Sequence, residues 1–449
     1  MSMFINREIE IEELNEIFSS KKAELVLIYG RRRVGKSKLL IEAIKNKRAL
    51  YLLADMSENI LEILSNQIKD KFAKFSNWED FFEFILKSDY DIIIIDEFQY
   101  LYNINKAWPT ILQRWWERLK ETNKKIILCG SIISTIYRIA KGYGSALYGR
   151  KTKEIEITPL NFFAVRKFLR KYNLKDSIKI YFILGGIPRY LEEIDTDKSF
   201  EENIKEKLIR KTSFLYNEVE NLLFEEFRNS TPYISILSAI SEGNIKFNDI
   251  SQVSKITTNK LSKYLSILER VKIISKNIPV TEKKTKSKIT RYKIIDLFYR
   301  FWFKFIFKNK SQIELGLNEE VYNNISKELN SYFGFMFEEL CKELLLPLGI
   351  LKLSKIGKWW HKDKEIDIVA LNEDSKEILF CECKWKDNVN VEKIIKELIE
   401  KSKFVPWNNE ERKEYFAVFA KSFKKKISSF EGKKVYCFDL KDIGKLLRK

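Results

Sequence analysis

Short, almost continuously apolar runs recur through the first part of the chain and alternate with longer stretches of helical periodicity. Three of these runs lack the polar and apolar alternation of a half-exposed sheet: 24–29, 91–95 and 125–128. Strands that are buried on both faces have this pattern, which is typical of a parallel sheet with helices on either side. The pattern therefore predicts an α/β domain with a parallel sheet over residues 1–220.

A different pattern begins near residue 226. It predicts a helix over 233–241, a short helix near 248–253, and a third helix that opens at Thr257 and carries Leu261, Leu265 and Leu268 on one apolar face. Two β-like stretches, 272–280 and 289–295, flank a lysine-rich tip. Three helices followed by a basic hairpin predict a winged helix-turn-helix domain over residues 226–310.

The last region, residues 325–449, reads as a small α/β domain. We expect a helix over 332–346, strands over 365–371 and 377–385, a helix over 391–402, and a further strand near 415–419. Trp359, Trp360 and His361 precede the first of these strands, and we expect them to pack in a loop. For His361, contact with a scissile phosphate is the alternative.

The amino-acid composition of these three predicted domains is strongly basic. The 449 residues include 82 Lys and Arg against 63 Asp and Glu, a formal net charge of +19. Such a balance attracts polyanions, nucleic acid first, although a biased genome composition acting on every surface would produce the same excess. No apolar run is long enough to span a membrane and the N-terminus lacks a signal-peptide core, so we expect a cytoplasmic protein with no membrane partner.

The numbers of histidines and cysteines limit the kinds of catalytic or metal site that the chain can form. The single histidine, His361, excludes any site that needs two imidazoles, so catalysis must use carboxylates, lysines, arginines and hydroxyls. The five cysteines form no Cys-x-x-Cys pair and are expected to be buried free thiols.

The first strand runs into a phosphate-binding loop. Residues 30–37 fit the pattern GxxxxGK[ST] and lead into a helix, the context in which that loop cradles phosphates. Lys36 is expected to neutralise phosphate charge and the Ser37 hydroxyl to bind Mg²⁺. The residues expected to bind ATP here are Gly30, Arg31, Arg32, Arg33, Val34, Gly35, Lys36 and Ser37.

Acidic and polar residues at the ends of two later strands complete this predicted site. Four isoleucines lead into Asp96, expected to hold Mg²⁺ through water, and Glu97, expected to orient or deprotonate the attacking water. Ser131 ends the next strand, where it either senses the γ-phosphate or simply closes a turn. Arg150 is either a cation for the transferring phosphate, in the same or a neighbouring subunit, or a solvated surface arginine.

Together these motifs resemble the archaeal-type P-loop ATPases, relatives of the AAA+ and STAND NTPases. The resemblance rests on Tyr-Gly-Arg-Arg-Arg-Val-Gly-Lys-Ser, Asp96-Glu97, Gly130-Ser131 and the segment 184–191, and it covers residues 4 to about 220. It implies a helical lid on the ATPase domain and a role for Gly186 and Pro188 in linking the nucleotide site to the lid. Separately, if Arg150 acts on a neighbouring subunit, we expect an ATP-dependent homo-oligomer. A helix break and turn is the plain structural alternative for Gly186 and Pro188.

The most specific chemistry in the last region is a carboxylate and lysine cluster. Strand alternation places Glu382 and Lys384 on one face, and Asp367 on the preceding strand can reach the same place through a hairpin. Carboxylates that hold Mg²⁺ can activate water against a phosphodiester, with a lysine stabilising the transition state.

The order helix, Asp, Glu-x-Lys is similar to the PD-(D/E)xK nuclease superfamily. That resemblance implies a restriction-endonuclease-like fold for residues 325–449 and makes Glu338 the acid on the preceding helix, with Glu339 as the alternative. Asp367 and Glu382 would be its other metal ligands. Ile366 stands where the family has proline, so the motif is less distinctive here.

The sequence therefore predicts an ATP-hydrolysing protein whose nucleotide state is coupled to binding of double-stranded DNA and to Mg²⁺-dependent cleavage of it. A signalling or scaffold ATPase whose C-terminal domain binds without cleaving is the main alternative. A chaperone-like ATPase with no nucleic-acid partner is the third.

Overall fold

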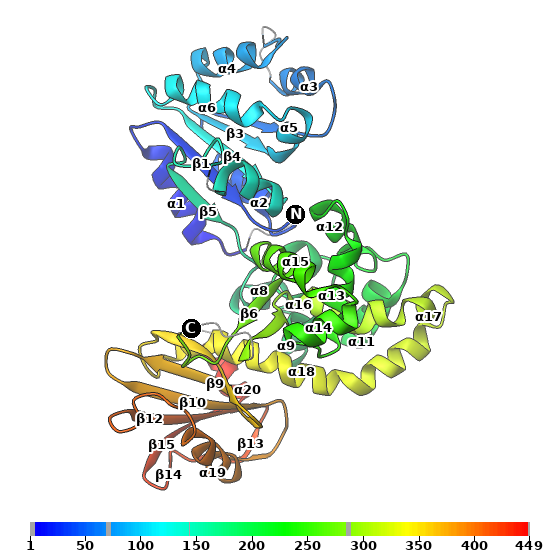
Figure 1. The fold of residues 1–449 in the computed structure, drawn as a ribbon, viewed down its shortest axis with the longest axis vertical. Helices are drawn as coiled ribbons and strands as arrows, with labels where there is room; N and C mark the ends of the chain where they lie inside the picture. Colours follow the sequence, from blue (N-terminus) through cyan, green and yellow to red (C-terminus); the bar gives the residue numbers. More distant parts are fainter. Residues whose placement is uncertain (1–4, 69–72, 143, 284–288, 448–449) are drawn as a thin grey trace. The chain divides into compact units, whose positions relative to one another are not determined.

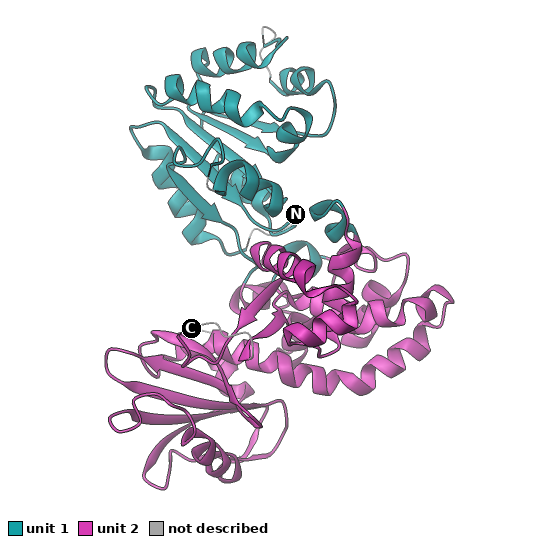
Figure 2. Cartoon of the chain, in the orientation of Figure 1, with its two compact units in different colours: residues 1–160, 186–192, 221–228 teal, residues 161–185, 193–220, 229–449 magenta. Residues whose placement is uncertain are grey.

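The computed structural model describes residues 5–68, 73–142, 144–283 and 289–447. The chain divides into two compact units (Figure 2). Unit 1 is Met1–Leu160, Gly186–Glu192 and Asn221–Arg228, and unit 2 is Asn161–Gly185, Glu193–Glu220 and Asn229–Lys449. Helices α8 (Phe162–Phe168) and α9 (Leu174–Leu184) belong to unit 2, where α9 packs against α16 (Leu297–Phe301).

Unit 1 is built on a five-stranded parallel sheet in the order β2-β3-β4-β1-β5 (Figure 1). Its strands are β1 (Glu24–Tyr29), β2 (Ala49–Leu53), β3 (Ile92–Asp96), β4 (Lys125–Gly130) and β5 (Lys153–Glu156). The three buried runs predicted from the sequence are confirmed as β1, β3 and β4. Since β4 lies between β1 and β3, the loops that follow these three strands meet at one edge of the sheet.

Amphipathic helices cover this sheet. In α6, the residues Trp108, Leu112, Trp115 and Leu119 recur at helical spacing and pack into a core shared with Leu25 of β1. The helices of unit 1 are α1 (Glu8–Ser19), α2 (Lys36–Ala43), α3 (Ile60–Gln67), α4 (Trp78–Lys87), α5 (Gln99–Ile104), α6 (Trp108–Leu119), α7 (Ile133–Ile136), η1 (Tyr137–Lys141) and α10 (Pro188–Leu191). Helix α12 (Glu218–Glu226) begins in unit 2 and ends in unit 1.

Gly186 holds the segment before α10 against the exit of β5. The N–H of Leu160 donates to the Gly186 carbonyl oxygen at 2.7 Å. A Cβ at position 186 would lie 1.7 Å from the Leu160 carbonyl oxygen, so no other residue fits without moving the backbone.

Unit 2 begins with helices and a two-stranded hairpin. The predicted three helices are present as α13 (Thr231–Ser241), α14 (Phe247–Ser254) and α15 (Thr258–Arg270), followed by the antiparallel strands β6 (Ile274–Asn277) and β7 (Arg291–Ile294). Lys284, Lys286 and Lys288 of the predicted basic tip lie outside the described residues. The other helices before the C-terminal sheet are α8, α9, α11 (Phe200–Ile204), η2 (Lys205–Ile209), α16, η4 (Trp302–Ile306), η5 (Phe307–Asn309), α17 (Lys310–Glu314) and α18 (Asn318–Leu348).

The C-terminal part of unit 2 is a mixed sheet in the order β14-β15-β12-β10-β9-β8. Strands β8 to β10 are antiparallel, and β10, β12 and β15 are parallel. The expected loop at Trp359, Trp360 and His361 is wrong, because these residues form the end of β8 and pair with β9. The elements are β8 (Lys355–His361), β9 (Lys364–Asn372), β10 (Glu377–Lys384), β11 (Val389–Asn390), α19 (Val391–Ser402), β12 (Lys413–Ala420), β13 (Phe423–Lys425), β14 (Ser429–Phe430), β15 (Lys433–Phe438) and α20 (Leu440–Leu446).

Candidate functional sites: a phosphate loop and a carboxylate cluster

The loop between β1 and α2 is folded around the side chain of Lys36. The Lys36 ammonium donates to the carbonyl oxygens of Gly30 at 2.9 Å and Arg31 at 3.0 Å. Gly35 caps α2 with a φ of 93°, a left-handed conformation that favours glycine. Burial lowers the pKa of Lys36, against the opposing effect of nearby acidic groups that include Glu97 and Asp96. The loop thus holds its lysine in place at the N-terminus of a helix, where an anion is favoured.

Asp96, at the end of β3, is bound to the serine of the phosphate loop. The Ser37 hydroxyl donates to Oδ2 of Asp96 at 2.5 Å, and the Tyr51 hydroxyl donates to the same oxygen, also at 2.5 Å. The Glu97 N–H donates to Asp96 Oδ1 at 2.9 Å. A hydroxyl and a carboxylate oxygen this close fit the all-oxygen coordination that Mg²⁺ prefers, so Ser37 and Asp96 are suited to hold it.

Glu97 turns toward the end of β4. Its Oε2 accepts a hydrogen bond from Ser131 Oγ at 2.6 Å and a second from the Gln99 amide. The strand order explains the contact, because β4 lies directly between β1 and β3. The sequence alone left two interpretations open for Ser131, a sensor of the γ-phosphate or a residue that closes a turn. In the structure Ser131 contacts the candidate catalytic carboxylate of Glu97.

The arginines near the loop have separate environments. Arg32 donates to Glu225 at 2.8 Å and to the Tyr100 hydroxyl. Arg150 is not brought to this cluster within its own chain: it precedes β5, toward the amino ends of the strands, and its Nε lies 3.8 Å from Glu117 of α6.

The end of α12 also contacts the loop that follows Ser131. The Glu226 carboxylate accepts the N–H groups of Ser134 at 2.7 Å and Ile133 at 3.3 Å, at the start of α7. Burial raises the pKa of Glu226 to about 7, although these two N–H groups and Arg32 act in the opposite direction. No sequence pattern points to Glu225 or Glu226, because their contacts join residues far apart in the chain.

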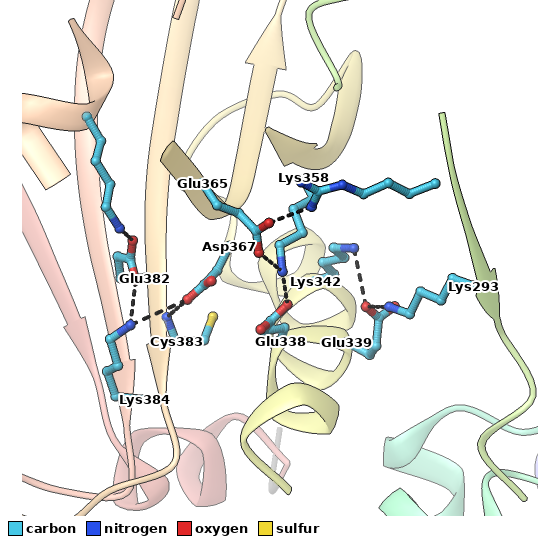
Figure 3. Close-up of polar contacts among 12 residues, drawn as sticks. Lys293, Glu338, Glu339, Lys342, Lys358, Glu365, Asp367, Glu382, Cys383 and Lys384 are labelled. Atoms are coloured by element: carbon cyan, nitrogen blue, oxygen red, sulfur yellow. Dashed lines mark hydrogen bonds and ion pairs between the residues drawn. The ribbon is translucent and has the colours of Figure 1, made fainter. Parts of the chain in front are cut away.

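In unit 2 the structure brings the predicted C-terminal cluster together. The Lys384 ammonium lies 2.6 Å from Glu382 Oε2 and 3.8 Å from Asp367 Oδ2 (Figure 3). The Cys383 N–H donates to Asp367 Oδ2 at 2.9 Å, and Lys401 of α19 donates to Glu382 Oε1 at 2.6 Å. Sequence reasoning missed Lys401, which lies on a helix rather than on the strand motif.

The two carboxylates of this cluster have opposite protonation tendencies. Burial, together with the negative charges of Glu382 and Glu338, raises the pKa of Asp367 to about 7. Burial acts in the same direction on Glu382, but Lys384 and Lys401 outweigh it and hold the pKa of Glu382 below its usual value. Protonation is therefore more favourable on Asp367 than on Glu382.

Glu338 of α18 lies on the other side of Asp367 and is engaged by Lys358 of β8 (Figure 3). The Lys358 ammonium lies 3.0 Å from Glu338 and 2.6 Å from Glu365, and Glu365 also accepts from Arg291 at 2.6 Å. Within the described ranges, no three Asp, Glu, His or Cys side chains are grouped closely enough to hold a metal ion. Asp367 and Glu382 both lie beside Lys384, but Glu338 is paired with Lys358. The expected metal site of three carboxylates is therefore not assembled in this conformation.

The alternative acid, Glu339, serves a different contact. It forms an ion pair with Lys293 of β7, whose side chain is partly buried, and this burial lowers the pKa of Lys293 to about 8. Arg291 of the same strand stacks on Trp360, 4.4 Å from the ring centroid. Arg291, which belongs to the predicted basic hairpin, is thus bound to the C-terminal sheet, whereas Lys272, Lys276 and Lys283 are exposed.

None of the helices in the part of the chain that the structure describes is long and apolar enough to cross a bilayer. The described cysteines are free; four are buried and Cys437 is partly exposed.

Comparisons with known proteins agree with the first site. Residues 4–194 match the family described as an ATPase domain predominantly from Archaea, and residues 302–395 match one described as archaea bacterial proteins of unknown function. The uncharacterized protein MJECL04 of Methanocaldococcus jannaschii is 38% identical over 454 residues, covering 98% of this chain and 100% of its own length. The uncharacterized ATP-binding protein MJ0423 of the same organism is 46% identical over 46 residues, 10% of this chain and 78% of that protein.

Among solved structures, the Walker-type ATPase PABY2304 of Pyrococcus abyssi has a TM-score of 0.49 at 22% identity and covers 67% of this chain and 96% of that one.

Proposed function

The chain belongs to the family of archaeal ATPases that its match over residues 4–194 and its full-length relative MJECL04 represent, and we propose that it hydrolyses ATP with Mg²⁺. We also propose that the nucleotide state is coupled to DNA binding. The observation that carries the ATPase proposal is the cluster of Lys36, Ser37, Asp96, Glu97 and Ser131 at one edge of the parallel sheet.

Each residue of this cluster has a proposed task. Lys36 leaves its two carbonyl partners and binds the β- and γ-phosphates, while Ser37 and Asp96 hold Mg²⁺. Bound Mg²⁺ neutralises charge that develops on the phosphoryl oxygens. Glu97 orients a water for attack on the γ-phosphate, and Ser131 fixes the Glu97 carboxylate through its hydrogen bond.

We propose that the region from α13 to β7 is a winged helix that binds double-stranded DNA. Helix α15 buries Leu261, Leu265 and Leu268 and exposes polar and basic residues on its other face, including Asn259 and Lys263. An exposed face of this kind suits the major groove, where asparagine can recognise adenine and lysine can contact phosphate.

The proposed coupled activity is Mg²⁺-dependent DNA cleavage at Asp367, Glu382 and Lys384. A buried and a partly buried carboxylate beside a lysine support it, because such a pair can bind a divalent ion and the lysine can stabilise the pentacoordinate transition state at phosphorus. Glu338 would supply a third ligand once it separates from Lys358.

A second candidate function, a scaffold ATPase whose C-terminal domain binds without cleaving, is favoured by the ammonium groups around this cluster. Both Glu382 oxygens are engaged, one by Lys384 and one by Lys401. A carboxylate neutralised in this way has a structural use even without a metal ion.

We further propose that ATP assembles the protein into a homo-oligomer in which Arg150 reaches the nucleotide of a neighbouring subunit. The position of Arg150 toward the amino ends of the strands supports action on a neighbour rather than on its own site. Arg150→Ala should lower ATP turnover without weakening ATP binding, and turnover per subunit should rise with protein concentration in the wild type.

One set of assays tests the main proposal. Wild type, Lys36→Ala and Glu382→Ala are incubated with plasmid and linear DNA, with and without Mg²⁺ and ATP. We expect Lys36→Ala to abolish ATP hydrolysis and Glu382→Ala to abolish cutting alone. ATP hydrolysis with no cutting by the wild type, but with retained DNA binding, supports the scaffold function. Absence of ATP hydrolysis in the wild type contradicts the ATPase proposal.

A further inference from the structure

We propose that Tyr51 is a positioning residue for Asp96 and thereby sets how tightly the nucleotide site binds Mg²⁺. This inference rests on the proposed ATPase function and extends it to a residue on a strand outside the phosphate-loop and Asp96-Glu97 motifs.

Tyr51 reaches Asp96 because of the register between β2 and β3. Strand β2 lies at one edge of the sheet beside β3, with Tyr51 opposite Ile94 and Leu53 opposite Asp96. Tyr51 and Asp96 are therefore diagonal neighbours on one face, a separation that a long aromatic side chain can span. The result is the 2.5 Å hydrogen bond from the Tyr51 hydroxyl to Asp96 Oδ2.

The Tyr51 hydroxyl carries one proton, and it donates this proton to the carboxylate oxygen Oδ2 of Asp96. A donor to a charged acceptor makes one of the stronger hydrogen bonds in proteins, so this contact has enough energy to fix a carboxylate rotamer.

The contact with Tyr51 differs in one respect from the other bonds to Asp96. Ser37 donates to the same oxygen, but its hydroxyl must turn when it binds Mg²⁺. The Glu97 N–H holds the opposite oxygen, Oδ1. The Tyr51 bond can persist in both states, and it keeps Oδ2 directed at the space beside Ser37 while the serine changes partner.

Tyr51→Phe removes the hydroxyl and leaves the ring. We expect the Mg²⁺ concentration for half-maximal ATP hydrolysis to rise about 10-fold, while kcat and the KM for ATP at saturating Mg²⁺ stay within about 2-fold of the wild type. A variant with general damage would lower kcat at every Mg²⁺ concentration. Tyr90→Phe, just before the amino end of β3, is the matched control and should not change the Mg²⁺ dependence.

A second measurement separates this inference from the proposed function. The Mg²⁺ dependence of binding of a fluorescent ATP analogue needs no hydrolysis, and Tyr51→Phe should shift it in the same direction. If the wild type binds the analogue but does not hydrolyse ATP, the ATPase proposal fails while this measurement still decides the role of Tyr51. An unchanged Mg²⁺ dependence in Tyr51→Phe overturns the inference.

A double-mutant cycle tests whether Tyr51 acts through Asp96. In an Asp96→Asn background the Tyr51 hydroxyl no longer donates to a carboxylate that can bind Mg²⁺. Adding Tyr51→Phe should therefore change the Mg²⁺ dependence of analogue binding by less than about 2-fold. Additive shifts of about 10-fold in that background would mean that Tyr51 acts elsewhere, and would overturn the inference as well.

Discussion

The hydroxyl of Ser131 donates to the carboxylate of Glu97 across 2.6 Å, so the residue that follows β4 touches the residue that follows β3. The contact joins residues from two strands that are neighbours in the sheet but distant in the chain. It places a polar side chain where it can respond to any movement of Glu97 during hydrolysis.

Ser131→Ala should lower kcat for ATP hydrolysis about 10-fold, since Glu97 loses a donor that fixes its orientation. The KM for ATP should stay within about 2-fold, because Ser131 makes no contact with the phosphate loop in this proposal. Steady-state ATPase kinetics check both values, with Ser134→Ala as a nearby serine control. A raised KM with an unchanged kcat would contradict the assignment.

Glu226 predicts a pH dependence of stability. Its pKa is raised to about 7 in the folded protein, so between pH 4.5 and pH 7 the native state binds more protons than the unfolded chain. This group therefore contributes stability at low pH that is lost as pH rises through that window, by about 2–3 kcal/mol.

Glu226→Gln should remove that pH dependence, because glutamine keeps an acceptor for the N–H groups of Ser134 and Ile133 but does not ionise. Urea unfolding at pH 5 and pH 7.5 measures it. Wild type should be the less stable of the two at pH 7.5, and an equal pH dependence in both proteins would refute the prediction.

Gly186→Ala should destabilise unit 1 by about 3 kcal/mol, because the new Cβ would overlap the Leu160 carbonyl and force the backbone to move. Urea unfolding followed by tryptophan fluorescence measures the loss. Gly334→Ala is the contrasting variant: it lies inside α18 with open space around the added Cβ, and it should stabilise the protein by about 0.5–1 kcal/mol. Equal effects of the two substitutions would contradict this reasoning.

Lys358→Met should tighten divalent-ion binding at the C-terminal cluster about 10-fold, because it releases Glu338 toward Asp367. Mn²⁺ binding measured by electron paramagnetic resonance in a nucleotide-free Lys36→Ala background checks this without any cleavage assay. Lys355→Met, on the same strand but paired with Glu373, is the control. Unchanged Mn²⁺ binding in Lys358→Met would show that Lys358 does not restrain a metal site.

The predicted wing shows the limit of counting charges. The sequence shows an excess of basic residues between 271 and 291, but it does not show which of them form ion pairs in the folded chain. Arg291 is bound by Glu365, a residue that lies far along the chain on a different sheet. Its charge is therefore largely used within the fold, and the DNA proposal depends more on α15 than on β7.

The amino-acid sequence by itself determined the local features: the buried strands β1, β3 and β4, the phosphate loop with Lys36, the acidic pair after β3, and the order of Asp367, Glu382 and Lys384. These follow from short-range rules of periodicity and spacing that hold wherever the segment lies. Tertiary structure alone decided which side chain donates to each carboxylate: Tyr51 to Asp96, Ser131 to Glu97, Lys401 to Glu382, and Lys358 to Glu338. Such pairings depend on strand order and register, because hydrogen bonds and ion pairs fall off over a few ångströms and only the folded chain brings distant residues that close.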